Sequence, residues 1–405
     1  MRQNNTAFDK AISFISASIQ QVSKISKPQK KFMGWLIEKW VMLPVRHNFL
    51  NIYRYSSGGY SEKSIREQFG RKINFFGWFE SALGKLKGKE CVAAFDPSYI
   101  KKSGKKTYGK GKFWSGKDQR VKDGLEIGCL ALVDVLDGTA YSMEAVQTPA
   151  NMQGKLMDHY ISIIKNRIGS ILSYTRYLAV DGFFMKNSFI DPLVKTGLHI
   201  ITKMRPDANL CYLYTGVQKK GRGRKRIYAG KVDVKNIDKR KWKRCYEDDQ
   251  IEAYELKAWC VALKRVVKVV YLDFKGRNGY AILLSTDTKM AGGKIISYYQ
   301  LRFQIEFLIR DAKQYAGLEE CQARSEIKLY NHFNMSLMTV SLMKFAYWAT
   351  LPEKQVIPFS MRSIKTYFYN KFLTETIFSR LGLELNCNKI KRLYNQCLNI
   401  GSMAA

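Results

Sequence analysis

Residues that bind transition metals or form covalent cross-links are scarce in this sequence. The chain of 405 residues has 4 histidines and 8 cysteines. The cysteines stand singly with no Cys-x-x-Cys pair, and no two histidines have the spacing of metal ligands. This pattern excludes a recognisable zinc site or disulfide framework and indicates reduced thiols in a cytoplasm. Any bound metal would therefore be a hard cation held by carboxylates.

Long apolar runs are absent as well. The best candidate, residues 335–343, ends at Lys344, well short of the roughly 18 residues that a membrane helix needs. Asp9 and Lys10 stand where a secretory signal would have its apolar region. We therefore expect a cytoplasmic protein with no membrane partner.

Negative charge is in short supply. Acidic residues number 34 against 68 lysines and arginines, which gives a net charge of +34. Such an excess destabilises a compact state by self-repulsion unless a polyanion offsets it. A hydrophobic content of 46% indicates a folded protein and not a disordered basic tail. We expect nucleic acid as the partner, and the length allows two or three domains.

Residues 1–88 are predicted to be helical and basic. An apolar helix is predicted over residues 32–43. Ser61 is a good N-cap for a second helix, and Gly70 separates that helix from another apolar segment at 73–83. The helix, glycine turn and helix fit a DNA-reading helix-turn-helix or an ordinary helical hairpin, and the sequence leaves both open.

The hydrophobic period changes to that of strands after Glu90. Strands are predicted at 91–95, 126–135, 140–148, 176–180 and 198–204, with helices at 154–172 and 184–195. Three strands followed by helix, strand, helix and strand is the order of a ribonuclease-H-like core. The predicted fold class is therefore α/β, with a mixed sheet.

Two basic stretches interrupt this core. Residues 101–122 are predicted to form a lysine- and glycine-rich loop that includes Lys105, Lys106 and Tyr108. Basic side chains interleaved with aromatic ones suit a nucleic-acid backbone better than a solvated loop. Residues 206–290 are predicted to be a β-rich basic insertion, with strands at 252–261, 266–274 and 280–284.

The insertion carries an arginine-rich run. Its members Arg222, Arg224 and Arg226 are suited to hydrogen-bond DNA phosphates. The alternative interpretation is a solvated or nuclear-localisation-like charge cluster.

Residues 299–313 carry the most specific pattern. On a helix, Tyr299, Arg302, Glu306 and Lys313 fall within about 60° of arc. The opposite, apolar stripe is formed by Leu301, Ile305, Leu308, Ala312 and Tyr315. A carboxylate among cations, with Arg310 close by, suits a site that holds a divalent metal and a phosphodiester. The alternative is a solvated face with ion pairs four residues apart.

Three acids occupy related places in the predicted core. Asp96 ends the first strand, Asp181 ends the fourth, and Glu306 lies on the late helix. The first and fourth strands are neighbours in this sheet order, so two carboxylates can lie side by side. Close carboxylates repel unless cations join them, and two Mg²⁺ ions could support an in-line phosphoryl transfer. Taken singly, Asp96 and Asp181 also fit ordinary turns.

The chain resembles the bacterial DDE transposases of the insertion-sequence IS4 group. That group's signature is Tyr, two residues, Arg, three residues, Glu, six residues, Lys, which is present at Tyr299, Arg302, Glu306 and Lys313. The resemblance spans roughly residues 40–350 and also covers the segments 95–99, 101–106, 179–184, 206–210 and 318–324.

The resemblance implies metal-dependent cleavage at transposon ends and joining of the 3′-hydroxyl to target DNA. Asp96, Asp181 and Glu306 would be the catalytic, metal-binding acids, with Mg²⁺ as cofactor and Mn²⁺ as a substitute. Tyr299, Arg302 and Lys313, joined by Arg310, would grip phosphates beside the scissile bond. The implied partners are double-stranded DNA, at terminal inverted repeats and target sites, and a second copy of the chain in a synaptic homodimer. The implied location is a nucleoid-associated bacterial cytoplasm.

Relatives stack a flipped base on a tryptophan in the insertion. Trp242, within a basic run, is the better candidate here, whereas Trp259 is expected to be buried.

The predicted organisation has five parts. They are an N-terminal helical DNA-binding domain (1–88), the first part of the catalytic core (89–205), the β-rich basic insertion (206–290), the last part of the core with the acidic helix (291–325), and a C-terminal helical region (326–405), in which residues 386–392 look like a loose end. Two alternative functions remain at this stage. One is a nuclease or resolvase that cuts without joining, and the other is a non-catalytic DNA-binding derivative of a transposase.

Overall fold

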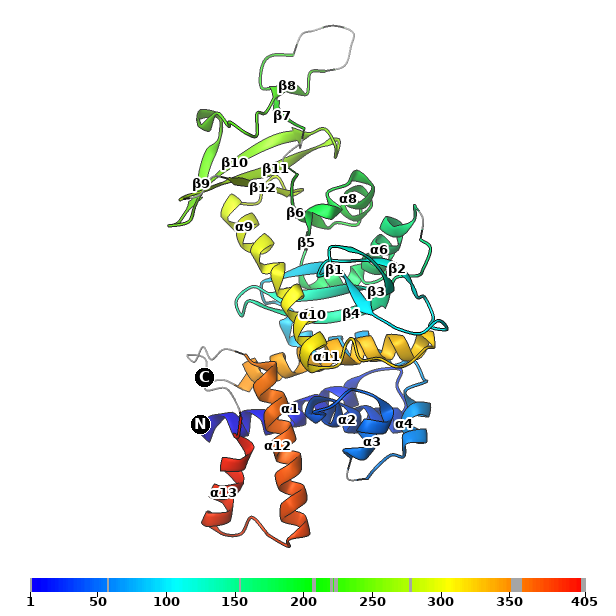
Figure 1. Ribbon diagram of the computed structural model, residues 1–405. Coiled ribbons are helices and arrows are strands. Elements are labelled where there is room, and N and C mark those ends of the chain that lie inside the picture. The colour runs from blue at the N-terminus through cyan, green and yellow to red at the C-terminus, as the bar shows by residue number, and fades with distance from the viewer. Residues whose placement is uncertain are drawn as a thin grey trace.

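The computed structural model describes residues 2–56, 58–152, 154–205, 209–218, 221, 225–276, 279–350 and 359–401, with only the backbone for 2–10, 349 and 350. The helices shown in Figure 1 are α1 (Arg2–Gln21), α2 (Lys27–Met42), α3 (Phe49–Arg54), α4 (Glu62–Gln68), α5 (Phe75–Leu83), α6 (Leu156–Lys165), α7 (Ile168–Tyr174), α8 (Asn187–Val194), α9 (Gly292–Leu301), α10 (Phe303–Tyr315), α11 (Glu326–Thr350), α12 (Met361–Arg380) and α13 (Asn388–Leu398). The strands are β1 (Cys91–Lys101), β2 (Gly111–Ser115), β3 (Arg120–Asp134), β4 (Thr139–Gln147), β5 (Tyr177–Val180), β6 (His199–Lys203), β7 (Leu210–Leu213), β8 (Tyr228–Lys231), β9 (Lys243–Glu247), β10 (Ile251–Cys260), β11 (Arg265–Phe274) and β12 (Tyr280–Ser285).

The strands join into one 12-stranded mixed sheet, which confirms the predicted α/β class. Its first part runs in the order β4, β3, β1, β5 and β6. β1 pairs antiparallel with β3 and parallel with β5. The first and fourth predicted strands are therefore neighbours, as expected. β1 is buried along its first half, where the apolar run from Cys91 to Phe95 lies in the core.

The boundaries of this first part differ from those predicted. The expected loop at 101–122 contains strand β2, which forms a hairpin with β3 and pairs Phe113 with Lys122. The two aromatic residues of β2, the half-buried Phe113 and the exposed Trp114, are adjacent, so the sequence lacks the alternation of apolar and polar residues that marks a strand. The expected helix at 154–172 breaks between α6 and α7. The break lies next to Arg167, whose Nε donates to Glu144 Oε2 at 2.7 Å.

Helix α11 lies under β4, at the edge of the sheet (Figure 1). Asn334 Nδ2 donates to the carbonyl of Ala145, and Asn334 Oδ1 accepts from the backbone N–H of Ala145, both at 2.8 Å. Ser341 Oγ accepts from the backbone N–H of Ser142, also at 2.8 Å. These side chains satisfy backbone groups that an edge strand would otherwise leave unpaired. Helix α11 thus packs against the edge of the sheet.

The N-terminal helices pack against the other side of α11. Helix α5 contacts α1, α11 and β4. Its Phe75, Trp78 and Phe79 are fully buried. α5 is the second helix of the candidate helix-turn-helix, and Glu80 is its one exposed residue, so it presents no basic face to a DNA groove. The packing therefore favours an ordinary helical hairpin over a DNA-reading helix-turn-helix. Ser61 caps α4 as predicted, with Oγ accepting from the N–H of Ser64 at 3.2 Å.

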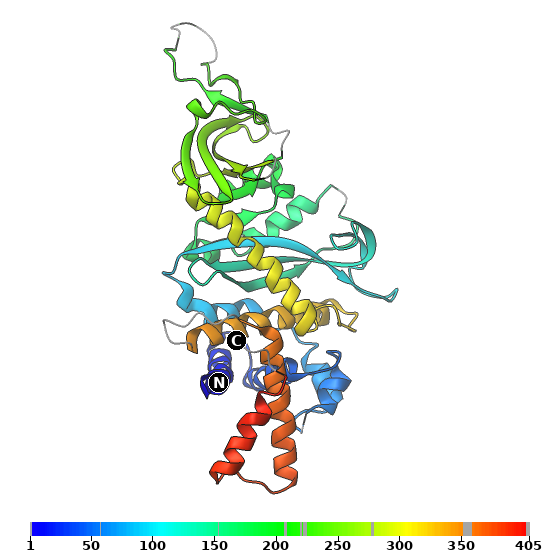
Figure 2. The same cartoon turned by 60° about the vertical axis from the view of Figure 1, so that its left-hand side comes forward.

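The insertion is β-rich, as predicted, and continues the sheet of the core. β12 pairs with β6, placing Leu284 opposite Thr202. Figure 2 shows β10, β11 and β12 curling into a half-open barrel above the core. The two tryptophans of the insertion have the reverse of their expected burial. Trp242 is 6% exposed, with its ring 6.2 Å from that of Tyr271, whereas Trp259 is only half-buried.

Helices α12 and α13 form a hairpin that projects from the body (Figures 1 and 2). The expected loose end at 386–392 is wrong, because Asn388 begins α13. The ring of Tyr394 lies 5.9 Å from that of Phe378, and its hydroxyl donates to Glu375 at 3.0 Å. Among the described helices, none is long and apolar enough to cross a membrane.

Candidate active site

The parallel pairing of β1 with β5 brings Asp96 and Asp181 to matching positions. Ala94 is the register partner of Ala179. Asp96 and Asp181 each follow two residues later. Asp181 stands directly after β5, whereas β1 continues past Asp96 to Lys101, so the prediction that the first strand ends at residue 95 is wrong. The hydroxyl of Thr202, on the next strand, donates to the carbonyl of Asp181 at 3.0 Å. It holds the turn after β5 against the sheet.

Gly182 gives this turn its close approach to the sheet. A Cβ at this position would lie 3.1 Å from the carbonyl oxygen of Lys203 on β6. A larger residue would therefore push the turn outward and move Asp181 with it. The requirement for glycine explains the Asp-Gly pair that the sequence shows.

Helix α10 carries Glu306 across β1 (Figure 2). Lys313 fixes the far end of the helix, because its Nζ donates to the carbonyl of Tyr99 at 2.7 Å. The same ammonium group lies 3.1 Å from Oε1 of Glu319. Burial is the main cause of the raised pKa of Asp96, and the nearby charges of Glu306 and Asp181 add to it. All three acids therefore lie in one region beside the middle of β1.

The signature segment is two helices and not the single one predicted. α9 ends at Leu301 and α10 begins at Phe303, with Arg302 at the junction. Ile305, Leu308 and Ala312 are buried as expected. The predicted exposed face is wrong at two positions, because Tyr299 is 8% and Arg302 3% exposed.

Arg302 is a buried cation with one donor unused. Its Nη1 lies 2.9 Å from Oε1 of Glu306, which forms the ion pair expected at this spacing. Its Cζ lies 4.5 Å from the ring centre of Phe303. Among the described residues, its buried Nε has no hydrogen-bond partner. Since an unpaired buried donor is costly, an oxygen of a ligand that reached this N–H would be bound favourably.

The environment of Asp96 opposes its negative charge. Burial raises the pKa of Asp96 to about 7, and the charges of Glu306 and Asp181 act in the same direction. The cations of Arg302 and Lys313 lower it and only partly compensate. A bound cation would relieve this repulsion.

The donor set suits Mg²⁺, which prefers carboxylate oxygens. Within the described chain, however, no group of three or more His, Cys, Asp or Glu side chains lies close enough together to hold a metal ion. The acids share a region without forming a compact cluster. The chemistry and topology of Asp96, Asp181 and Glu306 fit a divalent cation, and their side chains would have to converge further to bind one.

The remaining predicted DNA contacts are spread over the surface. Lys105 and Lys106 are exposed on the β1–β2 connection. Arg310 pairs with Asp311 at 3.1 Å and not with Glu306. Arg226 lies with its Cζ 4.8 Å from the ring centre of Tyr214. Trp242 is buried, so it presents little ring surface to a base. Arg222 and Arg224 lie outside the described residues.

Sequence reasoning missed Lys102 as a structural anchor. Its Nζ donates to the carbonyls of Cys321 and Ala323, the latter at 2.8 Å. This half-buried lysine ties the end of β1 to the segment after α10. In the sequence it is one lysine among many in a basic stretch, and no signal separates it from Lys105 or Lys106.

Two aspartates, one on β1 and one directly after β5, lie near a helix that bears a glutamate and a buried arginine, and this arrangement suits phosphodiester chemistry. Comparison with protein-family models gives a match to the transposase DDE domain over residues 87–342. The match covers well over half of the chain, which therefore belongs to the DDE transposase family. Asp96, Asp181 and Glu306 all lie within it. A search of curated proteins found no match.

Proposed function

We propose that this protein is a cut-and-paste transposase of the IS4 group. It would cleave DNA at the ends of its insertion sequence and transfer the freed 3′-hydroxyl into target DNA. The observation that carries the proposal is the matched placement of Asp96 on β1 and Asp181 directly after the paired strand β5, with Glu306 on the helix that crosses β1. The sheet order β4, β3, β1, β5 and β6 supports a ribonuclease-H-like core.

Asp96, Asp181 and Glu306 would hold Mg²⁺, with Mn²⁺ as a substitute. The cation would supply Lewis-acid activation of the attacking oxygen and stabilisation of the leaving one. The protein's own contribution is to position these carboxylates on a rigid sheet and helix. Glu306 also holds the guanidinium of Arg302 in place through their 2.9 Å ion pair.

Arg302, Lys313 and Tyr299 would bind the DNA strand beside these acids. The unused Nε of Arg302 can donate to a phosphate oxygen, and its charge would offset that of the phosphate. Burial raises the pKa of Tyr299, so its phenol stays protonated and can donate as well. The partners would be duplex DNA and a second copy of the chain, in a nucleoid-associated cytoplasmic complex.

The test is a cleavage-and-joining assay on DNA that carries the element's own ends, in Mg²⁺. Wild type is compared with Asp181→Ala and with the control Glu384→Ala, at an exposed acid in the α12–α13 turn. Nicks and joined products that are lost only in Asp181→Ala would support the proposal. Cut ends without joined products would indicate a nuclease or resolvase. Binding without cleavage in wild type would indicate a non-catalytic derivative.

A further inference from the structure

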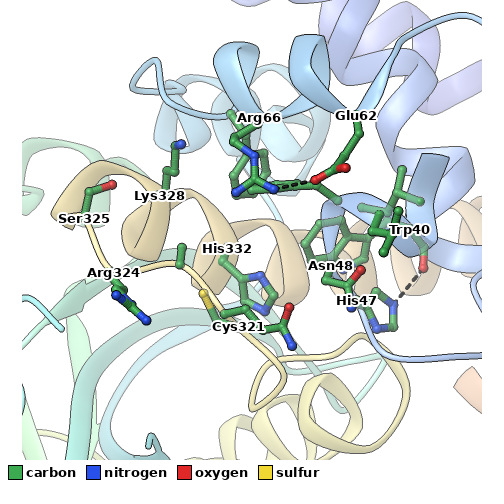
Figure 3. Close-up of a pocket in the computed structure, with 16 residues that line it drawn as sticks. Trp40, His47, Asn48, Glu62, Arg66, Cys321, Arg324, Ser325, Lys328 and His332 are labelled. Carbon is green, nitrogen blue, oxygen red and sulfur yellow. Dashed lines mark hydrogen bonds and ion pairs between the residues drawn. The ribbon is translucent and has the colours of Figure 1, made fainter. Parts of the chain in front are cut away.

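A pocket of about 600 Å³ lies where the N-terminal helices meet the segment between α10 and α11. One wall comes from residues 40–69 and the other from residues 321–332. Figure 3 shows Arg324, Ser325 and Lys328 on one side, Trp40, His47 and Asn48 on the other, and His332 between them. It is built from different residues than the region around Asp96.

The rim of this pocket is cationic. It carries Arg66, Arg324 and Lys328, and Glu62 is the one acid among the described residues that line it. Glu62 is already paired with Arg66. Neither Arg324 nor Lys328 has a side-chain hydrogen bond or ion pair within the described part of the chain. The rim therefore has two cations with unused donors, a combination suited to a phosphate group.

The inner wall of the pocket is aromatic and tightly packed. Trp40 and Phe69 are each 1% exposed and stack on each other with ring centres 6.0 Å apart, so they offer no free face. Both ring nitrogens of His47 and Nε2 of His332 already have protein partners, at Trp40, Glu320 and Gly317. The guanidinium of Arg66 lies with its Cζ 5.5 Å from the ring centre of Phe49, and its side chain is 56% exposed. A planar, uncharged group could enter the pocket and stack on this guanidinium plane.

The pocket is tied to the end of strand β1. The backbone N–H of Tyr108 donates to the carbonyl of Arg324 at 2.9 Å. Lys102 donates to the carbonyl of Ala323 at 2.8 Å. The intervening connection exposes Lys105 and Lys106. Positive charge thus continues from the strand that carries Asp96 to the rim of the pocket.

We infer that this pocket binds one unstacked nucleotide of single-stranded DNA, an inference that rests on the proposed function. Arg324 and Lys328 hold its phosphate, and the base enters the pocket beside the guanidinium of Arg66. Duplex DNA keeps its bases stacked inside the helix, so only a single-stranded segment can insert one into a recess. Cations beside aromatic rings are the usual chemistry of single-strand binding.

The test measures binding by fluorescence anisotropy in EDTA, which prevents cleavage. The probes are a blunt duplex and the same duplex with a short single-stranded overhang at one end. Wild type should prefer the overhang probe. The double variant Arg324→Gln and Lys328→Gln should lose about tenfold or more in affinity for that probe. Its matched control, Arg380→Gln and Lys389→Gln on the α12–α13 hairpin, removes the same charge elsewhere.

Two variants that fill the pocket test the effect of its shape separately from that of its charge. Gln322→Trp and Leu50→Trp, at exposed lining positions, narrow the pocket and leave every cation in place. Either should abolish the preference for the overhang and leave affinity for the blunt duplex unchanged. Equal wild-type affinity for both probes, or equal losses in the double variant and its control, would overturn the inference alone. Failure of wild type to bind either probe would also overturn the proposed function.

Discussion

Lys313 donates its ammonium group to the backbone carbonyl of Tyr99, 2.7 Å away. The bond joins the last turn of α10 to β1, three residues beyond Asp96. The distance between Glu306 and the two aspartates, Asp96 and Asp181, depends on how α10 lies across the sheet. Lys313 is thus a positioning residue as well as a candidate phosphate contact.

Replacing Lys313 by methionine should loosen this attachment. The stem of the side chain is kept, but the carbonyl of Tyr99 loses its donor, which we expect to lower the free energy of unfolding by about 1–2 kcal/mol. Cleavage should fall more than DNA binding, because one surface cation contributes little to a chain of charge +34. Urea unfolding and a cleavage assay measure both effects. Lys289→Met, at an exposed position, is the control and should change neither.

Asp96→Asn should stabilise the metal-free protein at pH 8. Since burial raises the pKa of Asp96 to about 7, the native state retains a proton that the unfolded chain releases from about pH 4 upward. Stability is therefore lost as the pH rises towards 7, and the neutral amide should restore about 2 kcal/mol at pH 8. Mg²⁺ should raise the thermal midpoint of wild type but not of the variant. Equal Mg²⁺ shifts in differential scanning fluorimetry would remove Asp96 from the metal site.

On acidification, the protein should begin to lose stability at a pH well above the usual pKa of carboxylates. Burial lowers the pKa of His332 to about 3, and its Nε2 faces the carbonyl of Gly317 at 2.7 Å. Below about pH 6.5 the unfolded chain takes up a proton that the native state refuses, so stability falls with pH. At pH 5 the loss from this one group is about 2 kcal/mol.

The variant His332→Gln isolates this contribution. It keeps a donor towards Gly317 but cannot titrate. We expect it to be less stable than wild type at pH 8 and to have a flatter stability profile between pH 8 and pH 5. Burial also lowers the pKa of His47 and His159. The stability of the variant should therefore still fall with decreasing pH, but less steeply than that of wild type. Parallel profiles for the two proteins in urea titrations would contradict the assignment.

The neighbourhood of Asp96 and Asp181 could be predicted because it depends on strand order, although β1 continues past Asp96 to Lys101 and does not end there as predicted. Both acids directly follow apolar runs that can only be strands, and the order of the elements fixes which strands pair. Likewise, the ion pair predicted from the i, i+4 spacing of Arg302 and Glu306 is present in the structure. Such local patterns are independent of how distant elements pack.

The burial of Arg302 and Tyr299 could not be read from the same pattern. Helical periodicity assigns both to a polar face, but the junction of α9 and α10 turns them towards the protein interior. Trp242 was misjudged for a related reason: its charged neighbours in the sequence are exposed, while its own ring packs on Tyr271. The pocket between the N-terminal helices and residues 321–332 depends on contacts between distant segments and has no sequence signature.

Glu306→Gln should separate catalysis from binding. The substitution keeps the size and hydrogen-bonding capacity of the side chain, but removes the charge that a divalent cation and Arg302 both need. Cleavage at the element's ends should fall by at least about 10³-fold, because a metal-binding acid acts on every step of phosphoryl transfer. Affinity for the ends should stay within about twofold, since the basic surface is unchanged. A matched loss of binding and cleavage, measured by anisotropy and by gel assay, would mean that Glu306 holds the helix and Arg302 in place and not the metal.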